Sequence, residues 1–156
     1  MIKRSAIGTI ALSAAAFVTL TLMESYRDSA YIPVAGDVPT IGFGTTEGVK
    51  MGDTITPPKA LTRALADVQK FEGLIKKCVT VPLHQYEYDA LVRFTYNVGA
   101  GAFCKSTLVK KLNAEDYEGA CREMKRWNRQ GGRVLDGLTK RRESEYRQCM
   151  GLYDLS

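Results

Sequence analysis

The chain has 156 residues, of which 45% are hydrophobic, so it can bury the core of one globular domain and is too apolar to be intrinsically disordered. Its formal charge of +5 suits a polyanionic partner such as a cell wall, an anionic lipid or a nucleic acid. Basic and aromatic residues are not interleaved in any nucleic-acid-binding motif, so we expect no nucleic-acid partner.

The first 23 residues have the pattern of a membrane-inserted segment. Lys3 and Arg4 precede 19 uncharged residues, SAIGTIALSAAAFVTLTLM. As a helix this run would reach about 28 Å at about 1.5 Å per residue, close to the ~30 Å hydrocarbon core of a bilayer. Basic residues before the run, and none immediately after it, predict an N-terminus in the cytoplasm and a chain that is external from Glu24 onward.

The composition of this run predicts a weak anchor. Ala, Ser, Thr and Gly fill 11 of its 19 positions, so it partitions into lipid less strongly than a Leu-rich helix and is able to leave the bilayer. A signal peptide cleaved at Ala14–Ala16 is the alternative, but cleavage there would leave the apolar residues 17–20 exposed. We therefore favour retention. Since Glu24 follows without a linker, tethering would hold this carboxylate at the lipid headgroups and keep the protein inactive.

The stretch from Glu24 to Thr46 carries the candidate catalytic groups. We expect Glu24 to open a helix, the Gly- and Pro-containing residues 32–39 to form a turn, and residues 40–44, TIGFG, to form a short strand. An acid that protonates a leaving oxygen and a carboxylate that activates water are the minimum equipment for breaking a glycosidic bond. Each residue alone is weak evidence, because Glu24 also reads as a helix N-terminal charge and Thr40 as an ordinary strand residue.

Helical periodicity covers most of the chain after this stretch. Thr56 and Pro57 signal the start of a long amphipathic helix that ends near Cys78. Further helices are expected over residues 84–98, 106–112, 116–127 and 138–149, separated by Gly, Asn and Gly-Gly stops. The predicted fold class is therefore α+β, a mainly helical domain with a small β-hairpin lobe and a long connecting helix.

The cysteines indicate disulfides rather than a metal site. They lack CxxC spacing, and His84 is the only histidine, so we expect no metal and no other cofactor. An even number in an exported chain predicts up to two disulfides, with three possible connectivities, and four buried free thiols are the alternative. The cysteines are Cys78, Cys104, Cys121 and Cys149.

The combined motifs resemble the phage-type lysozymes, or endolysins, and specifically those exported by a signal-anchor-release segment. The family pattern is a Glu opening a helix, then a Tyr, an acid, a Gly and Thr-Ile-Gly-x-Gly, which here looks like Glu24, Tyr31, Gly36 and residues 40–44. The resemblance covers nearly the whole chain. Its later motifs are Tyr96–Gly99, Ser106–Leu108, Leu112–Asn113, Trp127, Gly137–Arg142 and Glu145.

This resemblance implies a muramidase that hydrolyses the β-1,4 bond between N-acetylmuramic acid and N-acetylglucosamine in peptidoglycan. Its domains would be a signal-anchor-release segment, residues 1–23, and a lysozyme-like domain, residues 24–156. The protein would lie in the host inner membrane and then pass into the periplasm to lyse the cell, and we expect a monomer. A lytic transglycosylase, which uses the same Glu without water, and a non-catalytic membrane-anchored peptidoglycan-binding module are the rivals.

The resemblance also implies the catalytic residues, with Glu24 as the general acid and Asp37 and Thr40 positioning the attacking water. In the family the middle acid usually lies two residues after the Tyr, where this chain has Pro33. Asp37 is the nearest replacement, and we favour it over a site that works with Glu24 and Thr40 alone. Asp28 is a weaker candidate.

Four further residues are expected to bind substrate. Asn97 and Ser106 would hydrogen-bond N-acetyl groups, and Trp127 would stack on a sugar ring. Arg142, or alternatively Arg141, would pair with Glu24 across the cleft, as a family Arg does. The alternatives are helix-end caps for Asn97 and Ser106 and a core position for Trp127.

Overall fold

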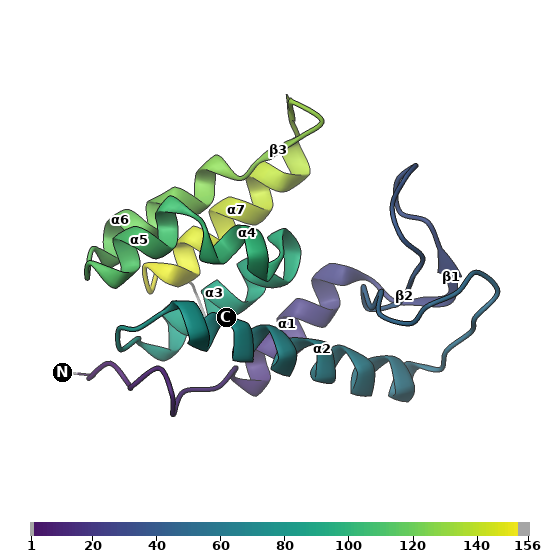
Figure 1. Ribbon diagram of the computed structural model, residues 1–156, viewed down its shortest axis with the longest axis horizontal. Coiled ribbons are helices and arrows are strands. Elements are labelled where there is room, and N and C mark those ends of the chain that lie inside the picture. Colours follow the sequence, from purple (N-terminus) through teal and green to yellow (C-terminus); the bar gives the residue numbers. More distant parts are fainter. Residues whose placement is uncertain (1, 153–156) are drawn as a thin grey trace. The chain divides into compact units, whose positions relative to one another are not determined.

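A computed structural model describes residues 2–152 and shows a mainly helical α+β protein, as the sequence predicts (Figure 1). The elements in chain order are α1 (Ala14–Glu24), β1 (Arg27–Tyr31), β2 (Thr40–Gly42), α2 (Pro57–Cys78), α3 (Gln85–Val98), α4 (Ala100–Cys104), α5 (Thr107–Asn113), α6 (Tyr117–Glu123), the 3-10 helix η1 (Met124–Arg126), β3 (Arg129–Gln130), β4 (Arg133–Val134) and α7 (Asp136–Cys149). Strand β1 pairs antiparallel with β2, and β3 pairs antiparallel with β4.

The chain divides into two compact units. The hairpin unit is Ala14–Lys70, and the helical unit combines Met1–Ser13 with Phe71–Ser156. This division reflects the contacts within the folded chain, and it does not coincide with the expected domain boundary after residue 23. That boundary concerns a membrane-inserted chain, and it stays a prediction.

In the hairpin unit, Glu24 ends helix α1, which corrects the expectation that it opens a helix. The following residue, Ser25, has a φ of 55°, the left-handed conformation that often terminates helices. Non-glycine residues seldom adopt this conformation, so a serine at this position does not indicate the end of a helix. The chain then enters β1, whose Arg27 pairs with Gly42 and whose Tyr31 pairs with Thr40.

Strand β2 is shorter than the expected run of residues 40–44. Gly42 and Gly44 have positive φ angles of 65° and 89°, and the backbones of Ile41 and Thr45 exchange two hydrogen bonds of 2.9 and 3.0 Å around them. A Cβ atom on Gly42 would lie 3.0 Å from the Cβ of Ala60. Gly42 therefore permits both the turn and the close packing of β2 on α2.

Helix α2 begins at Pro57 and ends at Cys78, as predicted. Its core-facing positions follow the helical period, and Ala60, Ala64 and Val68 are buried. Helix α2 starts in the hairpin unit and its last eight residues belong to the helical unit.

The helical unit is built around α3, whose residues 87–95 are all buried. His84 is its N-cap residue, and Gly99, with a φ of 89°, follows its end, close to the predicted span of 84–98. The hydroxyl of Ser106 accepts a hydrogen bond from the Val109 N–H and so caps α5, as expected for a helix start there. The local capping signals in this unit therefore placed the helix ends well.

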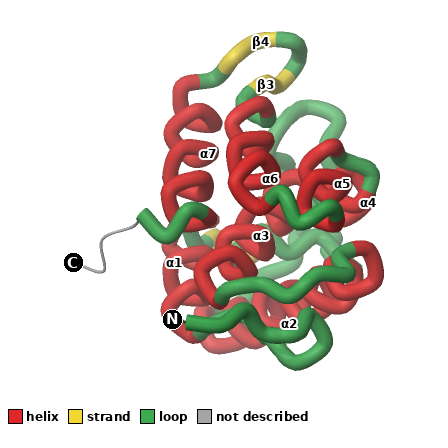
Figure 2. Tube along the Cα trace, turned by 90° about the vertical axis from the view of Figure 1, so that its left-hand side faces the viewer, coloured by secondary structure: helices red, strands yellow, loops and turns green. Residues whose placement is uncertain are grey.

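Two regions of the helical unit differ from the sequence expectation. The helix expected over 116–127 ends at Glu123 and continues only as the 3-10 turn η1. Gly131 and Gly132, expected only to break that helix, form the turn of the β3–β4 hairpin, which projects beyond the ends of α6 and α7 (Figure 2). The short helix α4 was also not expected.

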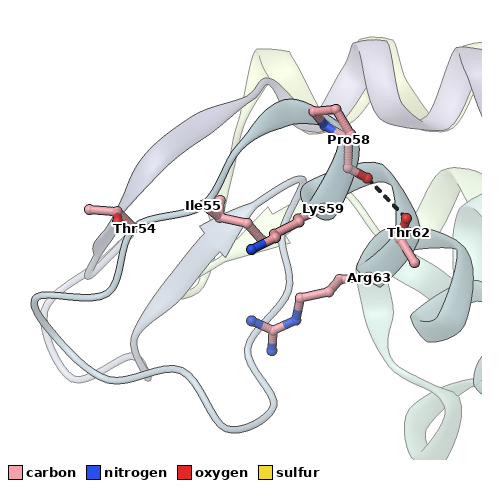
Figure 3. A pocket seen from close by; sticks show the side chains of 6 residues that line it. All are labelled: Thr54, Ile55, Pro58, Lys59, Thr62 and Arg63. Carbon is pink, nitrogen blue, oxygen red and sulfur yellow. Dashed lines mark hydrogen bonds between the residues drawn. The ribbon is translucent and has the colours of Figure 1, made fainter.

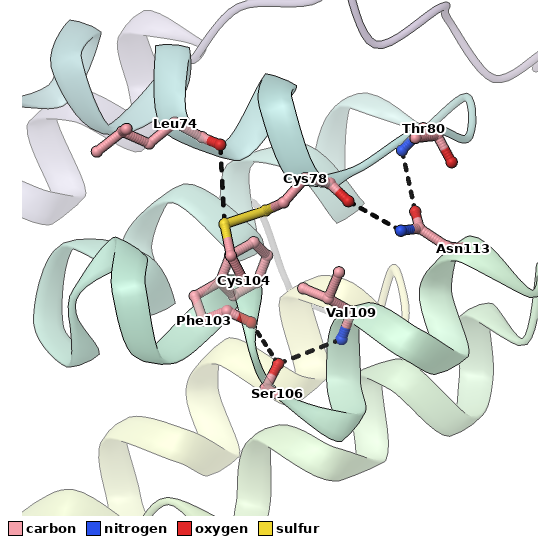
Figure 4. The surroundings of a disulfide bond; sticks show 8 residues. All are labelled: Leu74, Cys78, Thr80, Phe103, Cys104, Ser106, Val109 and Asn113. Carbon is pink, nitrogen blue, oxygen red and sulfur yellow. Dashed lines mark hydrogen bonds between the residues drawn. A yellow bond between two sulfur atoms is a disulfide. The ribbon is translucent and has the colours of Figure 1, made fainter.

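All four cysteines lie in the helical unit and form two disulfides, which confirms the prediction of paired thiols. Cys78 at the end of α2 is bonded to Cys104 in α4, and Cys121 in α6 is bonded to Cys149 in α7. Beside the first bridge, the amide of Asn113 donates to the Cys78 carbonyl at 2.8 Å and accepts from the Thr80 N–H at 2.9 Å (Figure 4). The end of α2 is thus tied covalently to α4 and by hydrogen bonds to α5.

In the folded chain α1 begins only at Ala14, so residues 5–13 are not helical there. The helix over residues 5–23 concerns the membrane-inserted chain and stays a prediction. Among the residues that the structure describes, no helix is both long enough and apolar enough to cross a bilayer. Backbone groups in residues 5–13 instead bond to the helical unit. The Leu12 N–H donates to Glu72 at 2.7 Å, while the Ser13 N–H and hydroxyl donate to the two carboxylate oxygens of Asp89 at 3.0 and 2.7 Å.

The beginning of the same segment is held by a charged contact. Arg4 donates two hydrogen bonds, of 3.1 and 2.8 Å, to the buried carboxylate of Glu87, and its guanidinium lies 3.6 Å from the ring centre of Tyr117. The next residue, Ser5, exchanges two backbone hydrogen bonds with Leu83. Residues 4–13 therefore form a strap across the helical unit, and we call them the N-terminal strap.

Candidate active site

Glu24 is half-buried at the C-terminal end of α1. The chain is fixed directly after it, because the Tyr26 hydroxyl donates to the Ile55 carbonyl at 2.6 Å and the Tyr26 ring lies 5.5 Å from that of Phe43. Glu24 thus has a defined place beside the hairpin while keeping exposed surface. Tyr26 was not singled out from the sequence, where nothing distinguishes it from the other seven tyrosines.

Thr40 is 6% exposed and lies at the start of β2, opposite Tyr31. Its hydroxyl donates to the Val38 carbonyl at 3.1 Å. This is the backbone contact that an ordinary strand threonine would make, and it uses the hydroxyl proton. The oxygen lone pairs can still accept a hydrogen bond, so Thr40 can hold a water molecule as an acceptor.

Asp37 is exposed in the loop between β1 and β2. Its N–H donates to the Val34 carbonyl at 2.9 Å, which closes a four-residue turn, and Gly36 takes the positive φ of 90° within it. Such a turn presents the Asp37 side chain to solvent. Asp37 lies in the same loop as Pro33, where the family acid is missing, and this shared loop is what makes it the replacement candidate. Its catalytic role stays a prediction.

All three catalytic candidates lie in the hairpin unit. Arg27, three residues after Glu24, pairs with Gly42, two residues after Thr40, so the end of α1 and the hairpin are linked by the β1–β2 register. Asp28, the weaker candidate, is exposed and accepts a hydrogen bond from the Ser29 hydroxyl at 3.0 Å.

A pocket of about 460 Å³ lies elsewhere on the hairpin unit. None of Glu24, Asp37 and Thr40 lines it. Lys59 and Arg63, one turn apart on α2, extend their charged ends toward the same side (Figure 3). Its other lining residues are Thr54, Ile55, Pro58 and Thr62.

In the helical unit, Asn97 and Arg142 contact each other. Arg142 is only 1% exposed, donates to the Glu145 carboxylate at 2.7 Å, and donates through Nη2 to Oδ1 of Asn97. Burial raises the pKa of Glu145 and lowers that of Arg142, while the attraction between the two charges opposes both shifts. Because Arg can only donate, Asn97 turns its oxygen inward, and its NH₂ group is the part left for other partners.

The structure leaves some of the expected substrate-binding residues accessible to a ligand and buries others. Asn97 is exposed, and its NH₂ group suits a carbonyl acceptor such as an N-acetyl group. The burial of Arg142 favours an indirect role through Asn97 over direct contact with a sugar, and its pairing with Glu24 stays a prediction. Ser106 donates to the Phe103 carbonyl at 2.6 Å and accepts from Val109, so both known contacts of its hydroxyl are internal.

Trp127 is half-buried, with its ring edge-on to Phe94 at 5.5 Å and 85°. This contact agrees with the core alternative, but part of the indole remains exposed and lines a second pocket. Its stacking on a sugar stays a prediction. Within residues 2–152, no group of three or more His, Cys, Asp or Glu side chains is placed to hold a metal ion.

Comparison with known proteins places these residues in context. A family profile described as Phage lysozyme matches residues 21–145. The SAR-endolysin of Pseudomonas phage phiKMV is 39% identical over 141 residues, which is 88% of this chain and 87% of that protein. Among solved structures, the endolysin from Escherichia coli O157:H7 phage FAHEc1 is 34% identical, with a TM-score of 0.82 over 96% of this chain and 99% of that one. The muramidase domain of SpmX from Asticaccaulis excentricus is 27% identical, with a TM-score of 0.82 over 90% of this chain and 97% of that one.

Proposed function

Since this chain belongs to the phage lysozyme family, we propose that it is an endolysin that hydrolyses the β-1,4 bond between N-acetylmuramic acid and N-acetylglucosamine in peptidoglycan and so lyses the host cell. One observation carries the proposal. A half-buried carboxyl, Glu24, ends α1 directly before a hairpin whose strand β2 begins with the buried Thr40, all within the region that the family profile matches.

In the proposed reaction, Glu24 is the general acid. It donates its proton to the oxygen of the glycosidic bond, and the leaving sugar departs with a free 4-hydroxyl group. The sugar that remains carries developing positive charge at its anomeric carbon. A water molecule adds there, so the net change is the insertion of one water across the bond.

Thr40 and Asp37 are assigned to the water. The Thr40 hydroxyl is committed as a donor to Val38, so it orients the water by accepting one of its hydrogens. Asp37 receives the proton that the water loses as it attacks. The exposed loop of Asp37 would have to close onto the bound glycan for this transfer, which makes Asp37 the less supported of the two.

The assignment is tested by Glu24→Gln, which keeps the shape of the side chain and removes the transferable proton. Loss of a general acid lowers the rate by about 10²–10⁴-fold. Glu47→Gln is the matched control, because Glu47 lies in the same unit and pairs with Lys70 at the surface. A Glu24→Gln protein that clears a peptidoglycan suspension at the wild-type rate would remove Glu24 from the mechanism.

Two further measurements separate the alternatives. Mass spectrometry of the digest distinguishes hydrolysis from lytic transglycosylation, which forms an anhydro product lighter by one water. Asp37→Asn tests the loop acid, since a site that works with Glu24 and Thr40 alone keeps its activity in this variant. Peptidoglycan binding that persists without any cleavage by the wild-type protein would instead favour a binding module.

We also propose that the protein is first held in the inner membrane by its N-terminal segment and is then released into the periplasm. Two observations support this, the small-residue composition of residues 5–23 and the name of the phiKMV relative, SAR-endolysin. The strap contacts add a physical reason. Glu72, Glu87 and Asp89 are buried carboxylates that accept hydrogen bonds from residues 4–13, and withdrawal of this segment would leave them short of partners.

Release is tested by raising the lipid affinity of the segment without changing the strap contacts. Gly8, Ala15 and Thr19 are exposed in the folded molecule, and a Cβ on Gly8 would meet open space. Replacing all three by Leu should keep the protein in the membrane fraction and delay lysis, whereas replacing Gly8 and Ala15 by Ser and keeping Thr19 should not. Lysis on the wild-type schedule in the Leu variant would refute release as the switch.

A further inference from the structure

The pocket of about 460 Å³ on the hairpin unit is lined by two segments of the chain. One is Thr54–Ile55, which is fixed by its backbone. The Ile55 N–H donates to the Asp28 carbonyl at 2.8 Å, and the Ile55 carbonyl accepts from the Tyr26 hydroxyl at 2.6 Å. A fixed lining lets a site bind a ligand without first being ordered. The other segment is the start of α2, which contributes Pro58, Lys59, Thr62 and Arg63 (Figure 3).

Two cationic side chains of α2 belong to this lining. Lys59 and Arg63 lie one helical turn apart, and their charged ends extend toward the same side (Figure 3). Lys59 is exposed, and among the described residues no hydrogen bond or ion pair engages its ammonium group. Its charge is therefore available to a ligand.

Arg63 is half-buried, and one contact already orients it. A terminal nitrogen of its guanidinium donates to the Glu47 carbonyl at 2.6 Å, which leaves the donors on the other nitrogens for a ligand. The Glu47 carboxylate does not line the pocket and is paired with Lys70 at 2.7 Å. Because the six lining residues include two cations and no acid, the pocket has an excess of positive charge.

Two threonine hydroxyls complete the polar part of the lining. Within residues 2–152 the Thr54 hydroxyl has no hydrogen-bond partner, so it can donate to a ligand. The Thr62 hydroxyl donates to the Pro58 carbonyl at 3.0 Å, so only its lone pairs remain (Figure 3). The available donors on Lys59, Arg63 and Thr54 match an anion with several acceptor oxygens. A phosphate group offers more such oxygens than a carboxylate does, and both Lys and Arg bind it well.

Apolar surface lies beside these donors. Ile55 and Pro58 contribute it, from the two segments that line the pocket. The volume falls within the range of small-molecule sites and exceeds what one phosphate group needs. The remaining space and the apolar surface suit the carbon skeleton of a phosphate ester.

We propose that this pocket, with Thr54, Lys59 and Arg63 as its donors, binds the phosphate group of a phosphate ester such as glycerol phosphate. The site is separate from the proposed cleavage reaction, because none of the catalytic candidates lines the pocket. Such esters occur as free solutes and as the headgroups of anionic phospholipids. In the second case the site holds the hairpin unit against a membrane surface.

Binding is measured on the isotope-labelled full-length protein, through the NMR shifts of its backbone amides. Glycerol phosphate should cause saturable shifts centred on Thr54, Lys59 and Arg63, whereas glycerol should cause none. Acetate, which has the charge but fewer acceptor oxygens, should bind about tenfold more weakly. Equal affinities for glycerol phosphate and acetate, shifts centred elsewhere, or no shifts at all would overturn the proposal.

A matched pair of lysine variants separates the pocket from general surface charge. Lys59→Gln should weaken the binding of glycerol phosphate about tenfold, because it removes a charged donor. Lys77→Gln removes an exposed lysine from the last turn of the same helix and should leave the affinity unchanged. Both side chains are exposed, so we expect both variants to fold. Wild-type affinity in Lys59→Gln, or equal losses in the two variants, would refute a specific site.

Sedimentation with lipid vesicles identifies the source of the phosphate ester. We compare phosphatidylcholine vesicles with vesicles of equal parts phosphatidylcholine and phosphatidylglycerol. If the site takes a lipid headgroup, the additional binding to the anionic vesicles falls in Lys59→Gln and persists in Lys77→Gln. If it takes a free ester, the two variants bind these vesicles alike, while Lys59→Gln still weakens the binding of glycerol phosphate. Binding to anionic vesicles without any response to glycerol phosphate would contradict the pocket and indicate a general attraction between charges.

Discussion

The contact of Arg4 with Glu87 should decide how firmly the N-terminal strap is held, and Arg4→Gln tests this. The substitution removes two hydrogen bonds to a carboxylate that is 4% exposed and a cation–π contact with Tyr117 at 3.6 Å. Because the Arg4 side chain is one-third exposed, at 33%, we discount the charged hydrogen bonds for solvent screening. We therefore expect Arg4→Gln to lower the free energy of opening the strap by about 2 kcal/mol. The hydrogen bond from the His84 N–H to Glu87 is kept in the variant and adds nothing to this difference.

Amide hydrogen exchange measures this opening directly. The Ser5 and Leu83 amides each donate to the other residue's carbonyl, at 2.8 and 2.9 Å, so they exchange only when the strap lifts. An opening that is about 2 kcal/mol easier speeds their exchange about 30-fold. Arg122→Gln, which breaks an exposed ion pair with Glu118, should leave both amides unchanged. Equal exchange in Arg4→Gln and wild type would refute the idea that Arg4 holds the strap.

Three further outcomes follow from contacts elsewhere in the molecule. Gly42→Ala should destabilise the protein by about 1–3 kcal/mol in urea unfolding, because φ is 65° and the new Cβ meets Ala60 at 3.0 Å. Gly36→Ala should cost less, since it strains φ but meets no atom within 4 Å, and the reverse order would contradict the packing argument. Removing either disulfide, which closes a loop of 26 or 28 residues, should cost about 3.5 kcal/mol, and an unchanged unfolding midpoint in reductant would count against it. The hydrogen bond with Lys111 lowers the pKa of Glu123 below 4.5, so the wild type should be more stable to unfolding than Glu123→Gln near neutral pH. This difference in stability should shrink as the pH falls through and below 4.5, and a difference that grows there would contradict the assigned direction of the pKa shift.

The parts of the fold that could be predicted are those fixed by neighbouring residues. Pro57 at the start of α2, Ser106 as the cap of α5 and Gly99 after α3 each act through their own backbone or the next turn. The pairing of the cysteines was expected, although its connectivity was not. The connectivity depends on which helices meet in three dimensions, and four cysteines carry no local record of that.

The parts of the folded structure that the sequence did not indicate depend on distant contacts or on an unusual conformation. Residues 5–13 have an apolar pattern that suits a helix, but in the folded chain Glu72 and Asp89 take the N–H groups of Leu12 and Ser13. Glu24 was expected to begin a helix because it follows an apolar run, whereas the left-handed Ser25 ends one there. A segment's conformation can depend on hydrogen-bond acceptors that lie far away in the chain, and the sequence does not show which acceptors these are.

The sequence indicated which residues belong to the candidate site, but not which of their side chains are buried. Glu24, Asp37 and Thr40 fall in one unit because all three belong to one short stretch of chain. Arg142, by contrast, reads as a surface charge within a basic run, yet it is almost fully buried against Glu145. Spacing alone does not report that a long basic side chain points inward, so its contact with Asn97 emerged only from the packing.

The position of Arg4 has an electrical consequence. In the proposed release, Lys3 and Arg4 start on the cytoplasmic side, and Arg4 ends against Glu87 on the other. A membrane potential that is negative inside opposes this passage by about 2.3 kcal/mol for each unit charge at 100 mV. An energised cell would thus hold the segment in place, and collapse of the voltage would remove that barrier at once, so the moment of lysis would be set by the state of the membrane rather than by the amount of enzyme made.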